Sequence, residues 1–196
     1  YTTLGQYAIN VGCEASLRAY VKDMPDFLAV YADQMDTIYT LLLLALLAVS
    51  HFMLEDYTQA LHWVRSYLYD EGTLQLRKGI QVLTTIRLCI YVDLQDWDAL
   101  EHAWYTAQAY LDKHIIFPKF WGICQRLFNG LLHPTPTSSA TELCRRFLDE
   151  CNTLFGGGEE ANLTAYFDFM AWAQGQVEKR PMREVVAYNF ANYDAG

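Results

Sequence analysis

Residues 54–61, LEDYTQAL, recur in degenerate form as residues 94–100, LQDWDAL, and each copy separates two long apolar stretches. Tyr57 and Trp97 hold equivalent places in the two copies and lie 40 residues apart. A fixed spacing between similar turns is typical of helical repeats, which bury their apolar faces by stacking on neighbouring repeats. The sequence therefore predicts an all-α array of helical hairpins.

The residues of the repeated motif have structural roles in this interpretation. Asp56 and Asp96 are expected to cap the second helix of each hairpin by accepting hydrogen bonds from its first backbone N–H groups. Tyr57 and Trp97 would then wedge between the two helices of a hairpin. Catalysis by these residues is not expected, because motif residues in repeats serve stacking.

Apolar periodicity and turn signals divide the chain into helical pairs within one domain, residues 1–196. Residues 1–35 are expected to be the remnant of a preceding repeat, with a helix around 7–21 and a turn at 23–25. The predicted pairs are 36–70, 75–113 and 117–155, and residues 159–190 are expected to form capping helices, the first over 159–179.

Composition narrows the classes of partner. The chain has 14 basic and 23 acidic residues and a formal net charge of −9, which disfavours nucleic acid and an anionic membrane surface. A basic or amphipathic peptide is the partner that this overall charge favours. Residues 37–54 carry no charged side chain, and we interpret them as a buried central helix rather than a membrane span.

No metal, cofactor or catalytic site is expected from the spacing of titratable residues. The five cysteines form no Cys-x-x-Cys pair, so reduced thiols and a cytoplasmic location are predicted. His51 and Glu55, one helical turn apart, are the best histidine pair, but a hydrogen-bonded histidine at a helix end is the preferred interpretation. Residues 93–98, with three aspartates, are interpreted as a solvated turn.

The C-terminal motifs carry a family resemblance. FDFMAW at 167–172 is followed by Arg180-Pro181 and by EVV at 184–186, and earlier the motif turn leads into ALHW at 60–63. In these features the chain resembles the tetratricopeptide-like (TPR-like) helical-repeat superfamily, and more closely a group of uncharacterised Bacteroidetes repeat proteins. The resemblance covers about residues 40–188 and implies a right-handed α–α superhelix with a protein-interaction role. Glu55 stands where such motifs usually place glycine.

One helix carries the candidate partner-binding residues. At about 100° per residue, one sector of the helix over 76–94 holds four polar side chains opposite its apolar stripe: Arg77, Gln81, Thr84 and Tyr91. The resemblance implies that the first helix of each pair lines the concave wall, where these residues would touch a partner. An ordinary solvated face is the alternative.

Three functions remain open at this point. The first is a non-catalytic scaffold that docks a protein or peptide in its concave groove, without a cofactor. The second is a structural module that forms homo-oligomers through aromatic faces built from Trp104, Trp121, Tyr166 and Trp172. The third is an all-α enzyme with a closed pocket, which would need clustered acid–base residues that the sequence spacing does not show.

Overall fold

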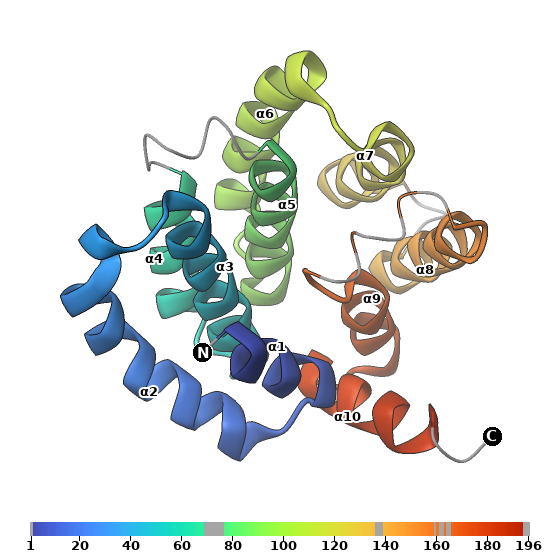
Figure 1. Ribbon diagram of the computed structural model, residues 1–196. Coiled ribbons are helices and arrows are strands. Elements are labelled where there is room, and N and C mark those ends of the chain that lie inside the picture. Colours follow the sequence, from blue (N-terminus) through green and yellow to red (C-terminus); the bar gives the residue numbers. More distant parts are fainter. Residues whose placement is uncertain are drawn as a thin grey trace.

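The computed structural model describes residues 2–68, 77–135, 139–158, 160, 163 and 166–193 (Figure 1). Within these ranges the chain is helical and contains no strand, which confirms the predicted all-α class. The helices are α1 (Thr2–Val11), α2 (Glu14–Tyr31), the 3-10 helix η1 (Ala32–Gln34), α3 (Thr37–Met53), α4 (Tyr57–Leu68), α5 (Arg77–Leu94), α6 (Trp97–His114), α7 (Pro118–Leu132), α8 (Ala140–Gly156), α9 (Phe169–Glu178) and α10 (Met182–Tyr193).

The charge-free segment forms the central helix α3. Asp36 caps its start by accepting a hydrogen bond from the Ile38 N–H at 2.8 Å. Most residues beyond Leu41 are buried, because α1, α2, α4 and α5 all pack against α3. No helix in the described ranges has the length and hydropathy needed to cross a membrane.

The repeated motif folds into the same helix-ending turn in both copies. Glu55 and Gln95 adopt left-handed conformations with φ of 60° and 54°. In each copy the N–H of the following aspartate donates to the carbonyl five residues earlier at 3.0 Å, the hydrogen bond that defines a Schellman cap. Glycine is the usual residue at this position, because it has no Cβ. The left-handed backbone conformation therefore costs free energy at Glu55 and Gln95.

The aspartates of the motif cap the next helices, as predicted. Asp56 Oδ1 accepts from the Gln59 N–H at 3.3 Å, and Asp96 Oδ1 accepts from the Ala99 N–H at 3.0 Å. Each motif therefore ends one helix and begins the next within three residues. The hairpin geometry follows from this local chemistry.

The two aromatic residues of the motif differ in burial. Tyr57 packs edge-on against Phe52, with ring centroids 5.6 Å apart, as expected for a wedge between α3 and α4. Trp97 is 44% exposed, so the same prediction is wrong for the second copy. α5 and α6 also contact each other less extensively than α3 and α4 do, in keeping with the exposed indole ring.

The N-terminal segment is more regular than predicted. α2 runs through Pro25, where we expected a turn, and the break lies earlier, at Gly12 with φ of 65°. The residues Leu17, Tyr20, Met24 and Leu28 form one buried face of α2. Burial of this continuous face compensates for the hydrogen bond that proline removes.

The predicted helix over 159–179 is wrong at residues 166–168, since α9 (Phe169–Glu178) begins only at Phe169, and residues 159, 161–162 and 164–165 lie outside the described residues. Asp168 caps it by accepting from the Ala171 N–H at 2.9 Å. Phe167 and Phe169 are both buried, with ring centroids 4.7 Å apart. Residues two apart point to nearly opposite sides of a helix, whereas the start of α9 after Phe167 lets both rings enter the same part of the core.

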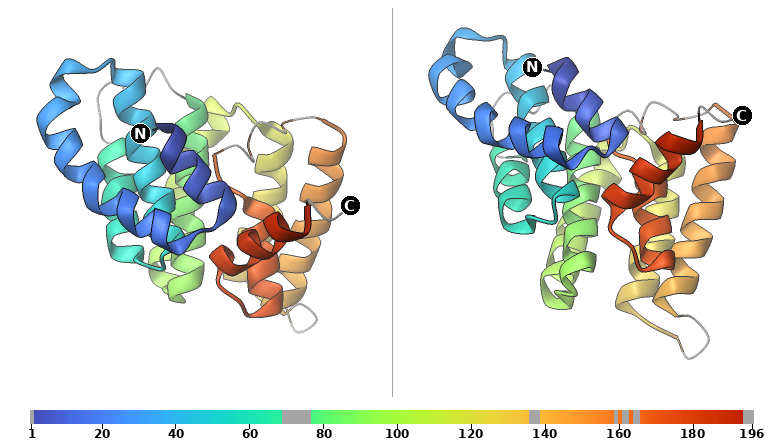
Figure 2. Two further views of the ribbon diagram at one scale, coloured as in Figure 1. Left: turned by 60° about the horizontal axis from the view of Figure 1, so that its bottom comes forward. Right: turned by 90° about the horizontal axis from the view of Figure 1, so that it is seen from below.

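The helices follow one another around the molecule until the last meets the first (Figure 2). α10 packs against α1, and Arg183 Nη2 lies 3.1 Å from Glu14 Oε2. Gly12 makes the close approach possible, because a Cβ there would stand 2.7 Å from the Arg183 carbonyl oxygen. The array thus closes into a ring of helices.

Three tryptophans are buried where neighbouring helices of the ring pack together. The rings of Trp104 and Trp121 lie 5.2 Å apart, and Trp104 Nε1 donates to Asn129 Oδ1 at 2.9 Å. Trp104, Trp121 and Trp172 are all buried, and only Tyr166 is exposed. The aromatic face on which we expected self-association to rest is therefore part of the core.

Candidate binding site

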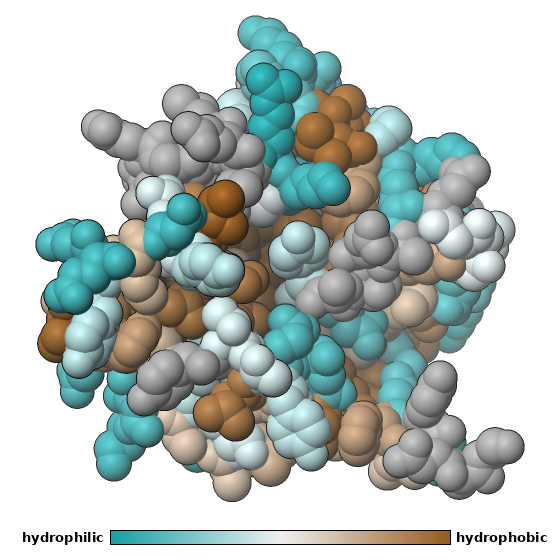
Figure 3. Space-filling model, viewed as in Figure 1, coloured by the Kyte–Doolittle hydropathy of each residue, from teal (hydrophilic) through white to brown (hydrophobic). Residues whose placement is uncertain are grey.

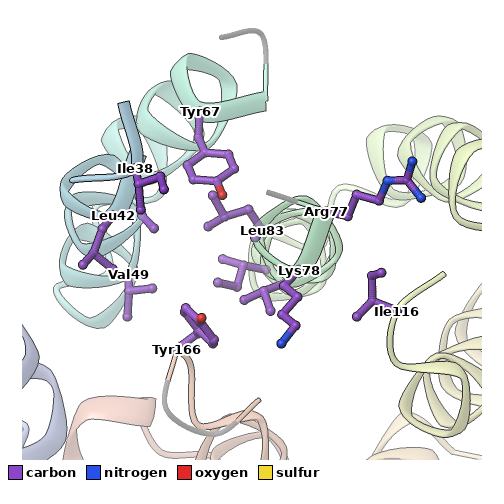
Figure 4. Close-up of a pocket in the computed structure, with 13 residues that line it drawn as sticks. Ile38, Leu42, Val49, Tyr67, Arg77, Lys78, Leu83, Ile116 and Tyr166 are labelled. Atoms are coloured by element: carbon purple, nitrogen blue, oxygen red, sulfur yellow. The ribbon is translucent and has the colours of Figure 1, made fainter. Parts of the chain in front are cut away.

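A hollow of about 510 Å³, here called the central hollow, opens on the face of the ring shown in Figures 3 and 4. Figure 3 shows apolar side chains deep in the middle of this face. The hollow lies between α3 and α5 and also touches α4 and the segments before α7 and α9. Its described lining residues are Ile38, Leu42, Ala45, Val49, Tyr67, Arg77, Lys78, Gly79, Val82, Leu83, Ile86, Ile116 and Tyr166.

The only charged side chains among these lining residues are Arg77 and Lys78. Both are exposed and stand in the first turn of α5. Figure 4 shows Lys78 reaching between Tyr166 and Ile116, while Arg77 extends on the Ile116 side of α5. The partial positive charge at a helix start adds to the two side-chain charges, so this part of the hollow attracts anions.

A glycine shapes the wall of the hollow. The buried Tyr67 side chain of α4 directs its hydroxyl onto the α5 backbone at Gly79. A Cβ at position 79 would overlap the hydroxyl oxygen and the adjoining ring carbon of Tyr67. The absence of a side chain at Gly79 therefore fixes how α4 meets the beginning of α5.

A second hollow of about 320 Å³ continues from the first along α3. Its described lining residues are Gln6, Asn10, Leu42, Ala45, Leu46 and Tyr166, of which Leu42, Ala45 and Tyr166 also line the central hollow. Ala45 therefore stands where the two spaces meet. A large side chain at this position would obstruct both.

The structure separates the four predicted partner-binding residues. Arg77 lines the central hollow, and Tyr91 is half-buried near the other end of α5. Gln81 and Thr84 are buried, so the expected exposed polar face is wrong at both. The helical spacing was read correctly, but α5 is covered on almost every side by α3, α4, α6 and the chain before α7.

Gln81 has a structural role that explains its polarity. Its Oε1 accepts from the N–H groups of Ile116 and Phe117, both at 3.1 Å, and its Nε2 donates to the Phe117 carbonyl at 3.1 Å. The side chain thereby satisfies the backbone of the link between α6 and α7, which runs across α5. Buried backbone groups need such partners.

Asp93 is the polar residue whose role was misjudged from the sequence. Rather than lying in a solvated turn, its carboxylate accepts hydrogen bonds from the Tyr57 hydroxyl at 3.1 Å, from Trp172 Nε1 at 3.1 Å and from Gln176 Nε2 at 2.5 Å. It joins α4, α5 and α9. Burial raises the pKa of Asp93 to about 6, although all three hydrogen bonds favour the ionised form.

A signal for Asp93 was present in the sequence. Ile86, Ile90 and Asp93 follow one another at spacings of four and three, so a carboxyl group occupies a core position of the α5 stripe. Beside Asp93 lies a polar hollow of about 280 Å³, whose lining includes Glu55, Gln95, Lys179 and Arg180. Acidic and basic side chains are mixed there, and no single ligand chemistry follows from them.

The histidine and cysteine residues form no reactive cluster in the described ranges. His51 pairs with Asp56, Nδ1 to Oδ2 at 3.2 Å, rather than with Glu55 as the sequence spacing indicated. Burial lowers the pKa of His51, against the opposing effect of Asp56. Within the same ranges no three His, Cys, Asp or Glu side chains are placed to hold a metal ion.

The cysteines are unpaired, and most are shielded from solvent. Burial raises the pKa of the Cys144 thiol to about 11 and that of Cys151 to about 12. Burial also raises the pKa of Cys89 and Cys124 well above the ordinary value. These four side chains therefore act as small core residues and not as nucleophiles.

No protein-family model matches the chain, and no curated protein and no solved structure is significantly similar to it. The central hollow is therefore the feature of the molecule from which a function is inferred.

Proposed function

We propose that this chain is a non-catalytic binding module of the TPR-like, right-handed superhelical type, which docks a segment of a protein or peptide partner in its central hollow. The observation that carries the proposal is the hollow, with about 510 Å³ of space between apolar side chains. Binding sites are characteristically concave, mostly apolar and supplied with a few polar groups. A partner would insert apolar side chains between α3 and α5.

The chemistry of the lining supports binding over catalysis. Its described residues are aliphatic side chains, two tyrosines, one glycine and two cations. Histidine, carboxylates and thiols, which supply most acid–base and nucleophilic catalysis, are not among the described lining residues; of the other side chains that can do such chemistry, Lys78, Tyr67 and Tyr166 line the hollow. The unpaired cysteines are compatible with the proposed cytoplasmic location.

Obstruction of the hollow tests this function. Ala45→Trp places an indole where the two hollows meet, and Ala109→Trp places the same group on an exposed position of α6 as the matched control. Wild-type protein and both variants would be used for affinity capture, with bound proteins quantified by mass spectrometry. We expect the partner to be retained by wild type and Ala109→Trp and lost with Ala45→Trp. Equal capture by all three proteins would exclude the hollow as the docking site.

Self-association is a second candidate, supported by a different surface from the one that we expected. Large apolar side chains are exposed on α1 and α3, including Leu4 (65%), Tyr7 (59%) and Tyr39 (60%). Scattered exposed apolar residues are common, whereas a contiguous group can mark an interface. Light scattering over a range of concentrations would show a dimer mass if copies pair through these residues. Leu4→Ser together with Tyr39→Ser would then restore the monomer.

A further inference from the structure

The charged side chains among the described lining residues of the central hollow are opposite in sign to the net charge of the chain. The protein carries a formal net charge of −9, yet the only charged side chains among the described lining residues are Arg77 and Lys78. Overall charge acts through solvent and is screened over about 8–10 Å at physiological salt. Among the described lining residues, Arg77 and Lys78 are therefore the charges nearest to a segment that enters the hollow.

We propose that the hollow selects an acidic amphipathic segment of a partner protein, with apolar side chains between α3 and α5 and an aspartate or glutamate beside Lys78, in the positive field to which Arg77 contributes. This inference rests on the proposed function and adds the chemistry of the partner. The overall charge alone favours a basic or amphipathic peptide; this inference keeps an amphipathic partner and makes it acidic rather than basic.

The position of Lys78 supports this arrangement, whereas the Arg77 side chain extends from the side of α5 away from α3 (Figure 4). Ile38, Leu42 and Val49 of α3 form one wall, whereas Lys78 lies across the hollow beside Tyr166 and Ile116 (Figure 4). An apolar side chain and a neighbouring carboxylate of one segment would thus meet different parts of the same site. Electrostatic complementarity of this kind gives specificity and register more than affinity, which the apolar contacts supply.

The cations are also placed where pairing with a partner has a low cost. Both side chains are exposed in the unbound protein, so neither has to leave a buried partner. They stand at the first turn of α5, where the helix dipole adds to their attraction for a carboxylate. A lysine or arginine of a partner would be repelled by the same positive charges.

The test is a selection of random dodecapeptides displayed on phage as internal fusions, so that no selected peptide presents a free C-terminal carboxylate. The targets are wild-type protein, Arg77→Glu/Lys78→Glu, Ala45→Trp and a charge-matched control, Arg65→Glu/Lys113→Glu. Arg65 of α4 and Lys113 of α6 are exposed and lie outside the lining of the hollow, so the control carries the same change in net charge. Circular dichroism melts confirm that each variant is folded.

We expect wild type to enrich peptides in which Asp or Glu neighbours large apolar residues. Their affinity should fall about tenfold or more in Arg77→Glu/Lys78→Glu, because two attractions become repulsions. It should change less than about twofold in the control and be lost in Ala45→Trp. Selection on the charge-reversed protein should enrich Lys or Arg in place of the acids.

Other outcomes separate this inference from the proposed function. Peptides that are lost with Ala45→Trp but show no acidic preference would overturn the inference and leave the docking function standing. Peptides that bind Ala45→Trp unchanged, or no enrichment at all, would overturn both. A separate assay measures the binding of dodecanoate, a small apolar anion. If no peptide is enriched but dodecanoate binds to wild type and not to Ala45→Trp, the hollow is a small-molecule site, and both the inference and the docking function are overturned.

Discussion

The hydroxyl group of Tyr67 occupies the place that a Cβ at position 79 would take, so the contact between α4 and α5 requires glycine at residue 79. Tyr67 and Gly79 both line the central hollow, and their contact shapes its wall. The glycine thus connects the packing of two helices with the form of the candidate site.

Gly79→Ala should lower the free energy of unfolding, because the buried Tyr67 ring has to move. Overpacking of this kind costs about 1–3 kcal/mol, which exceeds the gain from replacing glycine within a helix. Gly122→Ala in α7 is the control, since its Cβ would meet only Arg126 at 3.8 Å. There we expect stabilisation by about 0.5–1 kcal/mol. Urea denaturation measures the free energy of unfolding of both variants and of wild type. Equal stabilisation by the two substitutions would contradict the proposed role of Tyr67.

Glu55→Gly should stabilise the protein despite the removal of a side chain. The left-handed φ of 60° at Glu55 costs a non-glycine residue about 1–2 kcal/mol, part of which is offset by the greater freedom of glycine in the unfolded chain. A net gain of about 0.5–1 kcal/mol is expected in thermal denaturation. Asp98→Gly, inside α6, should instead lose about 0.5–1 kcal/mol. A loss at both positions would show that the Glu55 side chain makes a contribution greater than its backbone strain.

The sequence alone predicts most of the helices of this chain and the residues that cap two of them. Apolar periodicity predicts α3 to α8, and the aspartates at 56 and 96 predict where α4 and α6 begin. These features depend on interactions within a few residues, so the residues themselves specify them. The same reasoning misses the break at Gly12, because that turn matters chiefly through the distant α10.

The candidate site was less predictable, for a physical reason. Helical spacing shows which residues share a side of α5, but it does not show what covers that side. Gln81 was placed on the correct sector and interpreted as exposed, although a link 35 residues later in the chain docks on it. The central hollow likewise joins segments from Ile38 to Tyr166, and its existence depends on how all of them pack.

Gln81→Leu should destabilise the protein strongly, although it replaces a buried polar side chain with an apolar one. Two backbone N–H groups and one carbonyl of residues 116–117 would lose their partner, at about 1–3 kcal/mol for each group left buried and unsatisfied. Thr85→Val removes a hydroxyl that donates to the Gln81 carbonyl within α5 and also hydrogen-bonds the Cys124 side chain; because no backbone N–H loses its partner, it should cost less than about 1.5 kcal/mol. Chemical denaturation compares the two. A small effect at Gln81 would mean that water reaches the link.

Asp93 should make stability depend on pH in the direction opposite to that of an ordinary salt-bridged aspartate. Its pKa is about 6 in the folded protein, compared with the ordinary value of 3.8, so between these values the folded state holds a proton that the unfolded state has released. The free energy of unfolding should therefore fall as the pH rises from about 4 to about 7, by on the order of 2 kcal/mol from this group.

Asp93→Asn should lack this pH-dependent component, so its stability should rise relative to that of wild type as the pH increases across that range. Asp149→Asn, which removes an exposed carboxyl of α8, should keep the wild-type slope. Denaturant titrations at several pH values measure all three slopes, and a variant Asp93→Asn that tracks wild type would show that the buried carboxyl ionises freely.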